Sequence, residues 1–188
     1  MTMLNLQPAA ETMAAAALGV AETELDNRTP CPDYRVREIL AHVLGLCVAF
    51  GAAARKDLGE LTSSAPEAGA LPDDWRALMP TRLDHLVDAW KSPEAWDGMT
   101  QVGGVHLPGE VAGIVAMNEL TIHAWDLARS TGQSYEAPES ALLTSQGFLS
   151  SFDMRDGGPF GPIVPVADDA PLVDRVIGLS GRDPRWPT

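Results

Sequence analysis

A glutamate and a histidine four positions apart carry the clearest chemical signal in this chain. Glu119 and His123 lie in the apolar run 111–127, and residues at i and i+4 are neighbours on one helix face, about 5–6 Å apart at Cβ. The rest of that face is apolar and consists of Ala112, Val115, Ala116 and Leu127. A carboxylate on a buried face is costly unless it is paired or binds a metal. The spacing favours a divalent metal held by Glu119 and His123, although surface ion pairs produce the same spacing.

A third ligand is expected from a facing helix, because a catalytic zinc site combines three protein ligands with one open position. His42 fits best, since it lies within the apolar stripe of another predicted helix. That stripe consists of Val36, Ile39, Val43, Leu46 and Phe50. The alternative for His42 is a core histidine that is hydrogen-bonded to a backbone carbonyl. Of the other histidines, His85 lies among charged residues on a solvated face, and His106 is expected to point outward from a hairpin.

Three further residues near these positions have simpler interpretations. Glu38 lies in the first turn of the second predicted helix, where a carboxylate caps free backbone N–H groups. Asp126 either holds the second ring nitrogen of His123 or forms a surface ion pair with Arg129, and the surface role is favoured. Cys47 is rotated away from the apolar stripe and is expected to be a small core residue.

Helical patterns dominate the chain. Two β-prone runs, 99–102 and 105–107, flank Gly103 and Gly104 and predict a small hairpin. Pro80 is expected to kink or divide one helix, and residues 59–71 resemble a long surface connection. The pattern predicts an all-α helix bundle in a single domain over residues 1–188. The predicted helices span residues 4–25, 36–58, 73–90, 109–131, 138–152 and 171–179.

Composition and charge exclude several classes of protein. With 45% hydrophobic residues and a net charge of −13, the chain is globular and lacks the basic face that nucleic acid or acidic lipid requires. Two cysteines, Cys31 and Cys47, are too few for a disulfide scaffold, and reduced thiols in the cytoplasm are expected. The N-terminus lacks the basic leader of a signal peptide. No apolar run is expected to be long enough to span a bilayer.

Two segments resemble the mycothiol-dependent maleylpyruvate isomerase N-terminal family. They are residues 29–45, TPCPDYRVREILAHVLG, and residues 119–132, ELTIHAWDLARSTG. The segments FGPIVPV at 160–166 and GRDPRW at 181–186 are similar to a standalone actinobacterial branch of that family, described as metal-binding proteins. The resemblance covers nearly the full chain.

The resemblance implies a DinB-like four-helix bundle with an extra C-terminal helix and a divalent metal, zinc first and nickel as the alternative. The ligands that it implies are His42, Glu119 and His123. Two departures from the family pattern matter. Arg35 stands where the family commonly has Ser or Thr, so a favoured helix N-cap is lost. The C-terminal domain that accompanies the bundle in the isomerase is expected to be absent, so isomerase activity is not carried over.

Three functions are compatible with these residues. The first is a thiol-dependent metalloenzyme that binds mycothiol as a thiolate for attack on an electrophilic substrate, in S-transfer, conjugation or detoxification. Arg82, Arg129 and Arg155 are candidates for anchoring a polar cofactor. The second is a metal-dependent hydrolase, which needs a general base such as Asp126 or Asp153. The third is a non-catalytic metal-binding module. Related bundles often pair, so a homodimer is one assembly expected for this chain.

Overall fold

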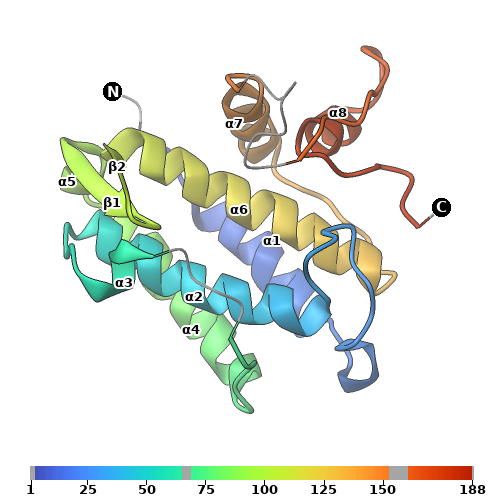
Figure 1. The fold of residues 1–188 in the computed structure, drawn as a ribbon, viewed down its shortest axis with the longest axis horizontal. Helices are drawn as coiled ribbons and strands as arrows, with labels where there is room; N and C mark the ends of the chain where they lie inside the picture. Colours follow the sequence, from blue (N-terminus) through green and yellow to red (C-terminus); the bar gives the residue numbers. More distant parts are fainter. Residues whose placement is uncertain (1–2, 65–68, 153–160, 188) are drawn as a thin grey trace.

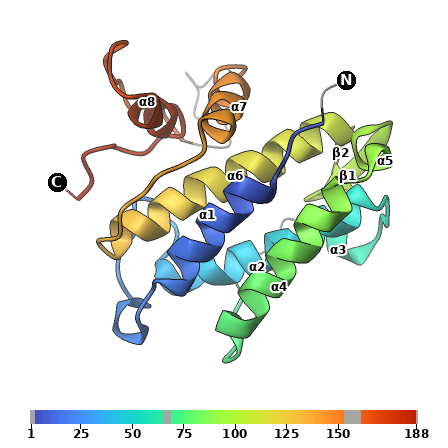
Figure 2. The ribbon, with the colours of Figure 1, turned by 180° about the vertical axis from the view of Figure 1, so that it is seen from behind.

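The computed structural model describes residues 3–64, 69–152 and 161–187 and is built around four long helices (Figure 1). Each of the four packs against two others, in the cyclic order α1, α4, α2, α6, and the view from behind shows α1 between α6 and α4 (Figure 2). The predicted all-α four-helix bundle is therefore confirmed. Its helices are α1 Gln7–Leu18, α2 Val36–Ala54, α4 Trp75–Trp90 and α6 Gly109–Ser130.

The apolar stripe predicted for the second helix points into the bundle. Val36, Ile39 and Val43 have no exposed surface, and Leu46 and Phe50 are also buried. Full burial of one such side chain stabilises a fold by about 1.5–3 kcal/mol. The stripe therefore fixes which side of α2 faces α4 and α6, and with it the direction of the polar residues at its margin.

The start of α2 is capped by Glu38, as predicted. Its Oε2 accepts a hydrogen bond from the backbone N–H of Arg35 at 2.6 Å. Arg35 has an extended backbone, with φ −85° and ψ 173°, as a residue that precedes a helix should have. The carboxylate of Glu38 thus stabilises the helix end, and it lies outside the candidate metal cluster.

Short elements connect the long helices. Gly103 and Gly104 have φ of 59° and 78°, a region that favours glycine, and they form the turn of the predicted hairpin. The hairpin strands pair antiparallel. The short elements are η1 Glu22–Glu24, α3 Glu60–Ser63, α5 Pro93–Trp96, β1 Met99–Val102 and β2 Val105–Pro108.

Two further helices, α7 (Glu139–Leu149) and α8 (Leu172–Leu179), cover one side of α6. They share a second apolar cluster with the outer face of α6. Its members are Ile122, Trp125, Leu142, Leu149, Val176 and Ile177. Because α6 lies between two apolar clusters, its buried residues surround the helix instead of forming one stripe. The extra C-terminal helix expected from the family resemblance is confirmed.

Some predicted helix boundaries are wrong. The first helix ends at Leu18 and α2 at Ala54, against predicted ends at residues 25 and 58. Lys56 has a φ of 57°, a left-handed conformation that cannot continue a helix. Pro80 lies inside α4 without dividing it. A proline removes one backbone hydrogen bond, and the packing of α4 against α1 and α2 holds the helix together.

One prediction about membranes is wrong as stated. By length and composition, Val36–Ala54 is apolar enough to cross a membrane, although no such run is predicted. Of this stretch, 72% is buried inside the protein, as in the core helix of a soluble bundle. The apolar surface of α2 therefore serves packing between helices.

Gly113→Ala is expected to destabilise the protein by about 1–3 kcal/mol. A Cβ atom at Gly113 would lie 2.9 Å from Cζ3 of Trp90 and closer still to the ring of Trp96. Both rings are buried and pack edge to face, so neither can move away easily. Urea unfolding of Gly113→Ala measures the loss. Gly147→Ala on α7 is the matched control, because its Cβ would contact nothing within 4 Å. Equal stability of the two variants would contradict the packing argument.

Candidate metal centre

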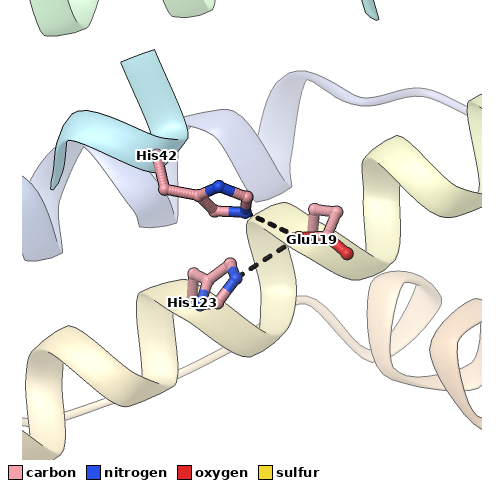
Figure 3. Close-up of side chains that lie close together, drawn as sticks. All are labelled: His42, Glu119 and His123. Atoms are coloured by element: carbon pink, nitrogen blue, oxygen red, sulfur yellow. Dashed lines mark ion pairs between the residues drawn. The ribbon is translucent and has the colours of Figure 1, made fainter. Parts of the chain in front are cut away.

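The three predicted ligands lie together between α2 and α6 (Figure 3). Oε2 of Glu119 is 3.5 Å from Nε2 of His42 and 3.3 Å from Nε2 of His123. The three potential ligand atoms all lie within 4.8 Å of one another. The two imidazole rings are nearly perpendicular, at 82°, with centroids 5.1 Å apart. Both histidines therefore direct the same type of nitrogen towards one carboxylate oxygen.

Local spacing explains two of these positions, and helix packing explains the third. Glu119 and His123 are one turn apart on α6, so they share a face. α2 packs along α6 and places His42 opposite that face. The exposed fractions of the His42, Glu119 and His123 side chains are 13%, 19% and 7%. The cluster therefore lies at the margin of the core, where a small molecule can reach it.

Asp126 is a buried partner of His123, and the predicted surface role is wrong. The Asp126 side chain has no exposed surface, and its Oδ2 lies 3.0 Å from Nδ1 of His123. Arg182, just after α8, approaches the same carboxylate, with Nη2 3.1 Å from Oδ2 and Nε 3.3 Å from Oδ1. The expected partner, Arg129, instead donates a hydrogen bond to the backbone carbonyl of Trp186 at 3.1 Å.

This arrangement fixes the ring of His123. A metal-binding histidine commonly donates its second ring N–H to a carboxylate, which sets both tautomer and orientation. With Nδ1 held by Asp126, Nε2 faces Glu119. Arg182 compensates the charge of Asp126, whose burial would otherwise be costly. Sequence reasoning misses Arg182, because 56 residues separate it from Asp126 and only the packing of the C-terminal segment joins them.

Burial and hydrogen bonding act in opposite directions on protonation at this site. Burial alone would raise the pKa of Glu119, but hydrogen bonds with His123 and His42 hold it well below its usual range. Burial alone would lower the pKa of His123, but hydrogen bonds with Asp126 and Glu119 raise it to about 9. The pKa of Asp126 is lowered, because the charge of Arg182 and the contact with His123 outweigh burial. Without metal, two carboxylates thus hold a protonated imidazole.

A pocket of about 310 Å³ borders the three candidate ligands. This volume is in the range of small-molecule sites. The ring of Tyr34 packs on that of His42, with centroids 5.3 Å apart, and forms part of the wall. A molecule in the pocket can therefore reach an ion held by the three ligands. The other lining residues are Cys31, Pro32, Asp33, Asn118, Ile122, Gly161 and Arg182.

The arginine at this pocket is one that the sequence does not single out. Arg182 lines the pocket, whereas Arg82 donates a hydrogen bond to the backbone carbonyl of Leu44 at 3.0 Å and lines a different cavity. Arg129 binds the C-terminal backbone, as described above. Arg155, the third anchor proposed from sequence, lies outside the described residues. Neither Arg82 nor Arg129 therefore lines this pocket.

The remaining histidines and Cys47 lie outside the cluster, as predicted. His85 and His106 are both exposed. His106 Nε2 lies 3.4 Å from Nε2 of Gln101 on the paired strand of the hairpin. Cys47 is buried, and burial raises the pKa of its thiol to about 12. Such a thiol is a small apolar core residue at neutral pH.

The donor set suits a divalent transition metal. Two imidazole nitrogens and one carboxylate oxygen are ligands found in catalytic zinc sites, where a fourth position stays open for substrate. The same donors also accept nickel, iron or copper. The carboxylate behind His123 is the outer hydrogen-bond partner that such sites usually contain. The residues present therefore fit a metal.

Comparisons with known proteins agree with this architecture. The sequence matches the family described as the mycothiol maleylpyruvate isomerase N-terminal domain over residues 6–128. Two relatives in Mycobacterium tuberculosis, uncharacterized protein MT0763 of strain CDC 1551 and uncharacterized protein Rv0738 of strain H37Rv, are each 25% identical over 183 residues. These matches cover 95% of this chain and 96% of each relative.

Similarity in fold extends past the bundle. Crystal structures of the mycothiol-dependent maleylpyruvate isomerase and of its histidine-to-alanine mutant each give a TM-score of 0.67 at 18% identity, over 94% of this chain and 86% of the isomerase chain. Since α6 ends at Ser130, so broad a match includes residues after the bundle. The expected absence of the isomerase's C-terminal domain therefore finds no support in this match. The family match over residues 6–128, more than half of the sequence, shows that this chain belongs to the mycothiol maleylpyruvate isomerase N-terminal domain family.

Proposed function

We propose that this chain binds a divalent metal through His42, Glu119 and His123 and uses it to bind mycothiol as a cosubstrate. The observation that carries the proposal is the convergence of three ligand atoms within 4.8 Å at the wall of a pocket. The name of the family supplies the thiol. We expect zinc, with nickel as the alternative, because the donor set accepts both.

The residues of the site have separate tasks in this proposal. A divalent cation held by the three ligands would lower the pKa of a coordinating thiol and so supply a thiolate at neutral pH. Asp126 orients the ring of His123 and is itself neutralised by Arg182. The side chain of Ile122 and the ring of Tyr34 line the pocket and limit the access of bulk water.

The second substrate that we propose is a small electrophile, such as an electron-poor alkene. The thiol sulfur adds to the electrophilic carbon and forms one C–S bond. The thiol proton leaves to solvent, and the neighbouring carbon takes up a proton from water, so that thiol and acceptor give one thioether. Conjugation of this kind would serve detoxification. Reversal of the addition after rotation about the former double bond would give isomerisation.

The two other functions have less support from the structure. A metal-dependent hydrolase needs an available general base at the pocket. Of the two bases named from the sequence, Asp126 is already bound to His123 and Arg182, and Asp153 lies outside the described residues. A non-catalytic module is expected to close its metal site with a fourth protein ligand. In the described part of the chain, the candidate cluster contains three ligands and borders a pocket. The arrangement favours an enzyme.

Cobalt(II) substitution tests the thiol proposal directly. Titration of the cobalt-loaded protein with mycothiol is expected to produce a saturable thiolate-to-cobalt absorption band. S-methylated mycothiol, which cannot form a thiolate, should leave the spectrum unchanged. If mycothiol changes neither the spectrum nor the affinity for cobalt, the thiol-dependent function is wrong even where the metal binds.

We also propose that residues 1–188 form one domain, that the protein is cytoplasmic and that it forms homodimers. The packing of α7 on α6 and of α8 on α7 supports one domain. Cys31 and Cys47 form no disulfide, as expected in a reducing compartment. Light scattering coupled to size-exclusion chromatography tests the assembly, and a monomer over the whole concentration range would contradict the dimer.

Zinc affinity is expected to rise with pH, by about tenfold per pH unit between about pH 6 and 8. In the metal-free protein the pKa of His123 is raised to about 9, so the imidazole carries a proton in this range. That proton must leave before Nε2 can bind zinc, so each zinc ion displaces one proton. Calorimetry in buffers of different ionisation enthalpy counts the protons. An affinity that does not change with pH would contradict this expectation.

The metal-free protein supplies the control. Its stability should fall as the pH rises, whereas the zinc affinity should increase. Folding raises the pKa of His123 from 6.5 to about 9. The protonated imidazole therefore stabilises the fold fully below about pH 6.5, and this stabilisation is lost as the pH rises through about 9. Urea unfolding of chelator-treated protein at the two ends of this range measures the difference.

A further inference from the structure

Asn118 is a buried polar residue at the pocket wall. Its Oδ1 has no hydrogen-bond partner among the described residues, and the whole residue is only 1% exposed. Native proteins pair nearly all such groups, so an unpaired one needs an explanation. Asn118 lines the same pocket as the three candidate metal ligands. Its carboxamide is therefore placed where a bound molecule can supply the missing partner.

The position of Asn118 on α6 determines which part of a ligand it can meet. It directly precedes Glu119 and lies one helical turn before Ile122, which also lines the pocket. Ile122 belongs to the apolar cluster beneath α7 and α8. Asn118 thus stands between the metal ligands and an apolar surface. Because Asn118 and Glu119 are adjacent on α6 and line the same pocket, we expect a ligand held through its sulfur to present a group near the sulfur to Asn118.

Arg182, the arginine at the pocket, is already engaged. Arg182 donates hydrogen bonds to the carboxylate of Asp126 and, at 2.9 Å, to the backbone carbonyl of Ser180. The carboxamide of Asn118 offers both an acceptor oxygen and donor N–H groups. This pair of functions matches a secondary amide, whose N–H can donate to Oδ1 while its carbonyl accepts from Nδ2. An aliphatic chain offers neither group.

We infer that Asn118 forms a hydrogen-bonding subsite for an amide group next to the thiol of the ligand. The subsite makes the pocket selective for thiols that carry an amide over plain alkyl thiols. This inference rests on the proposed thiol-binding function and adds to it a residue that determines specificity. In the ligand-free protein, the buried and unpaired Oδ1 of Asn118 lowers the stability of the fold. A ligand that donates a hydrogen bond to this atom removes that cost.

The test compares two thiols on cobalt-loaded wild-type protein and on Asn118→Leu, which keeps a similar volume. N-acetyl-L-cysteine amide carries amide groups beside its thiol, and 1-propanethiol carries none. Asn118→Leu is expected to weaken binding of the amide thiol about tenfold and to leave binding of propanethiol unchanged or tighter. An equal effect on both thiols, or none on either, would overturn the subsite. If mycothiol alters the wild-type spectrum and neither small thiol does, the subsite fails and the thiol-binding function stands. If mycothiol leaves the spectrum unchanged as well, the thiol-binding function fails, and the subsite fails with it.

Two further variants separate recognition from folding. Thr121→Val also removes a buried polar group from α6, but the Thr121 hydroxyl donates to the backbone carbonyl of Met117 at 2.7 Å and does not line the pocket. It should leave the ratio of the two thiol affinities unchanged. Asn118→Ala removes the carboxamide without adding apolar volume and should reproduce the loss of selectivity. Asn118→Leu is expected to melt no lower than the wild type, since it removes an unpaired group.

Discussion

His123→Ala is expected to remove stoichiometric zinc from the purified protein. His123 supplies one of the three ligand atoms, and its Nε2 lies 3.3 Å from the carboxylate of Glu119. Zinc binding to four-ligand structural sites is worth about 10–16 kcal/mol, so one lost ligand costs roughly 3 kcal/mol, or more than about 100-fold in affinity. Elemental analysis of untagged protein and competition with a zinc chelator measure this loss.

The control for this experiment is His85→Ala. His85 is exposed on α4, outside the candidate cluster, so its removal should leave the zinc content unchanged. The fold of His123→Ala should survive, because Asp126 keeps its ion pair with Arg182 and Glu119 keeps His42 beside it. Circular dichroism checks this point. Near-stoichiometric zinc in a folded His123→Ala protein would refute the proposed ligand set.

The ligand cluster could be predicted because two of its features are local. The four-residue spacing of Glu119 and His123 places both on one helix face whatever the tertiary fold. The apolar stripe around His42 shows that this histidine faces a neighbouring helix, and the structure brings it within 3.5 Å of the carboxylate. The hairpin could be predicted for the same reason, because its turn requires positive φ and two consecutive glycines supply it.

The surroundings of the cluster could not be predicted, because they depend on contacts between distant segments. Asp126 has the sequence environment of a surface residue, with Arg129 three positions later, yet it is buried under the C-terminal segment. Its partner Arg182 becomes evident only when that segment is placed on α6. The burial of Asn118 could not be predicted either. Nothing in the sequence around this asparagine indicates whether it lies in a pocket wall or on the surface.

Asp126→Asn is expected to weaken zinc binding about 10- to 100-fold while all three ligands stay in place. The substitution preserves shape but removes the charge that accepts the Nδ1–H of His123 at 3.0 Å. If the new amide turns its NH₂ group towards Nδ1, that nitrogen becomes an acceptor. The ring proton then moves to Nε2, the atom that the metal needs. Chelator competition measures the affinity, and the wild-type protein gives the reference.

Asp88→Asn is the matched control, because it removes the same charge from a different place. Asp88 pairs with Lys91 at 2.7 Å on the exposed face of α4. A general effect of net charge would weaken zinc binding in both variants, whereas an orienting role affects Asp126→Asn alone. The pH profile gives a second signature. Without the Asp126 carboxylate, His123 loses one of the hydrogen bonds that raise its pKa. Its zinc affinity should therefore level off at a lower pH than in the wild type. Equal zinc affinities of the two variants would mean that Asp126 contributes to folding and not to the metal.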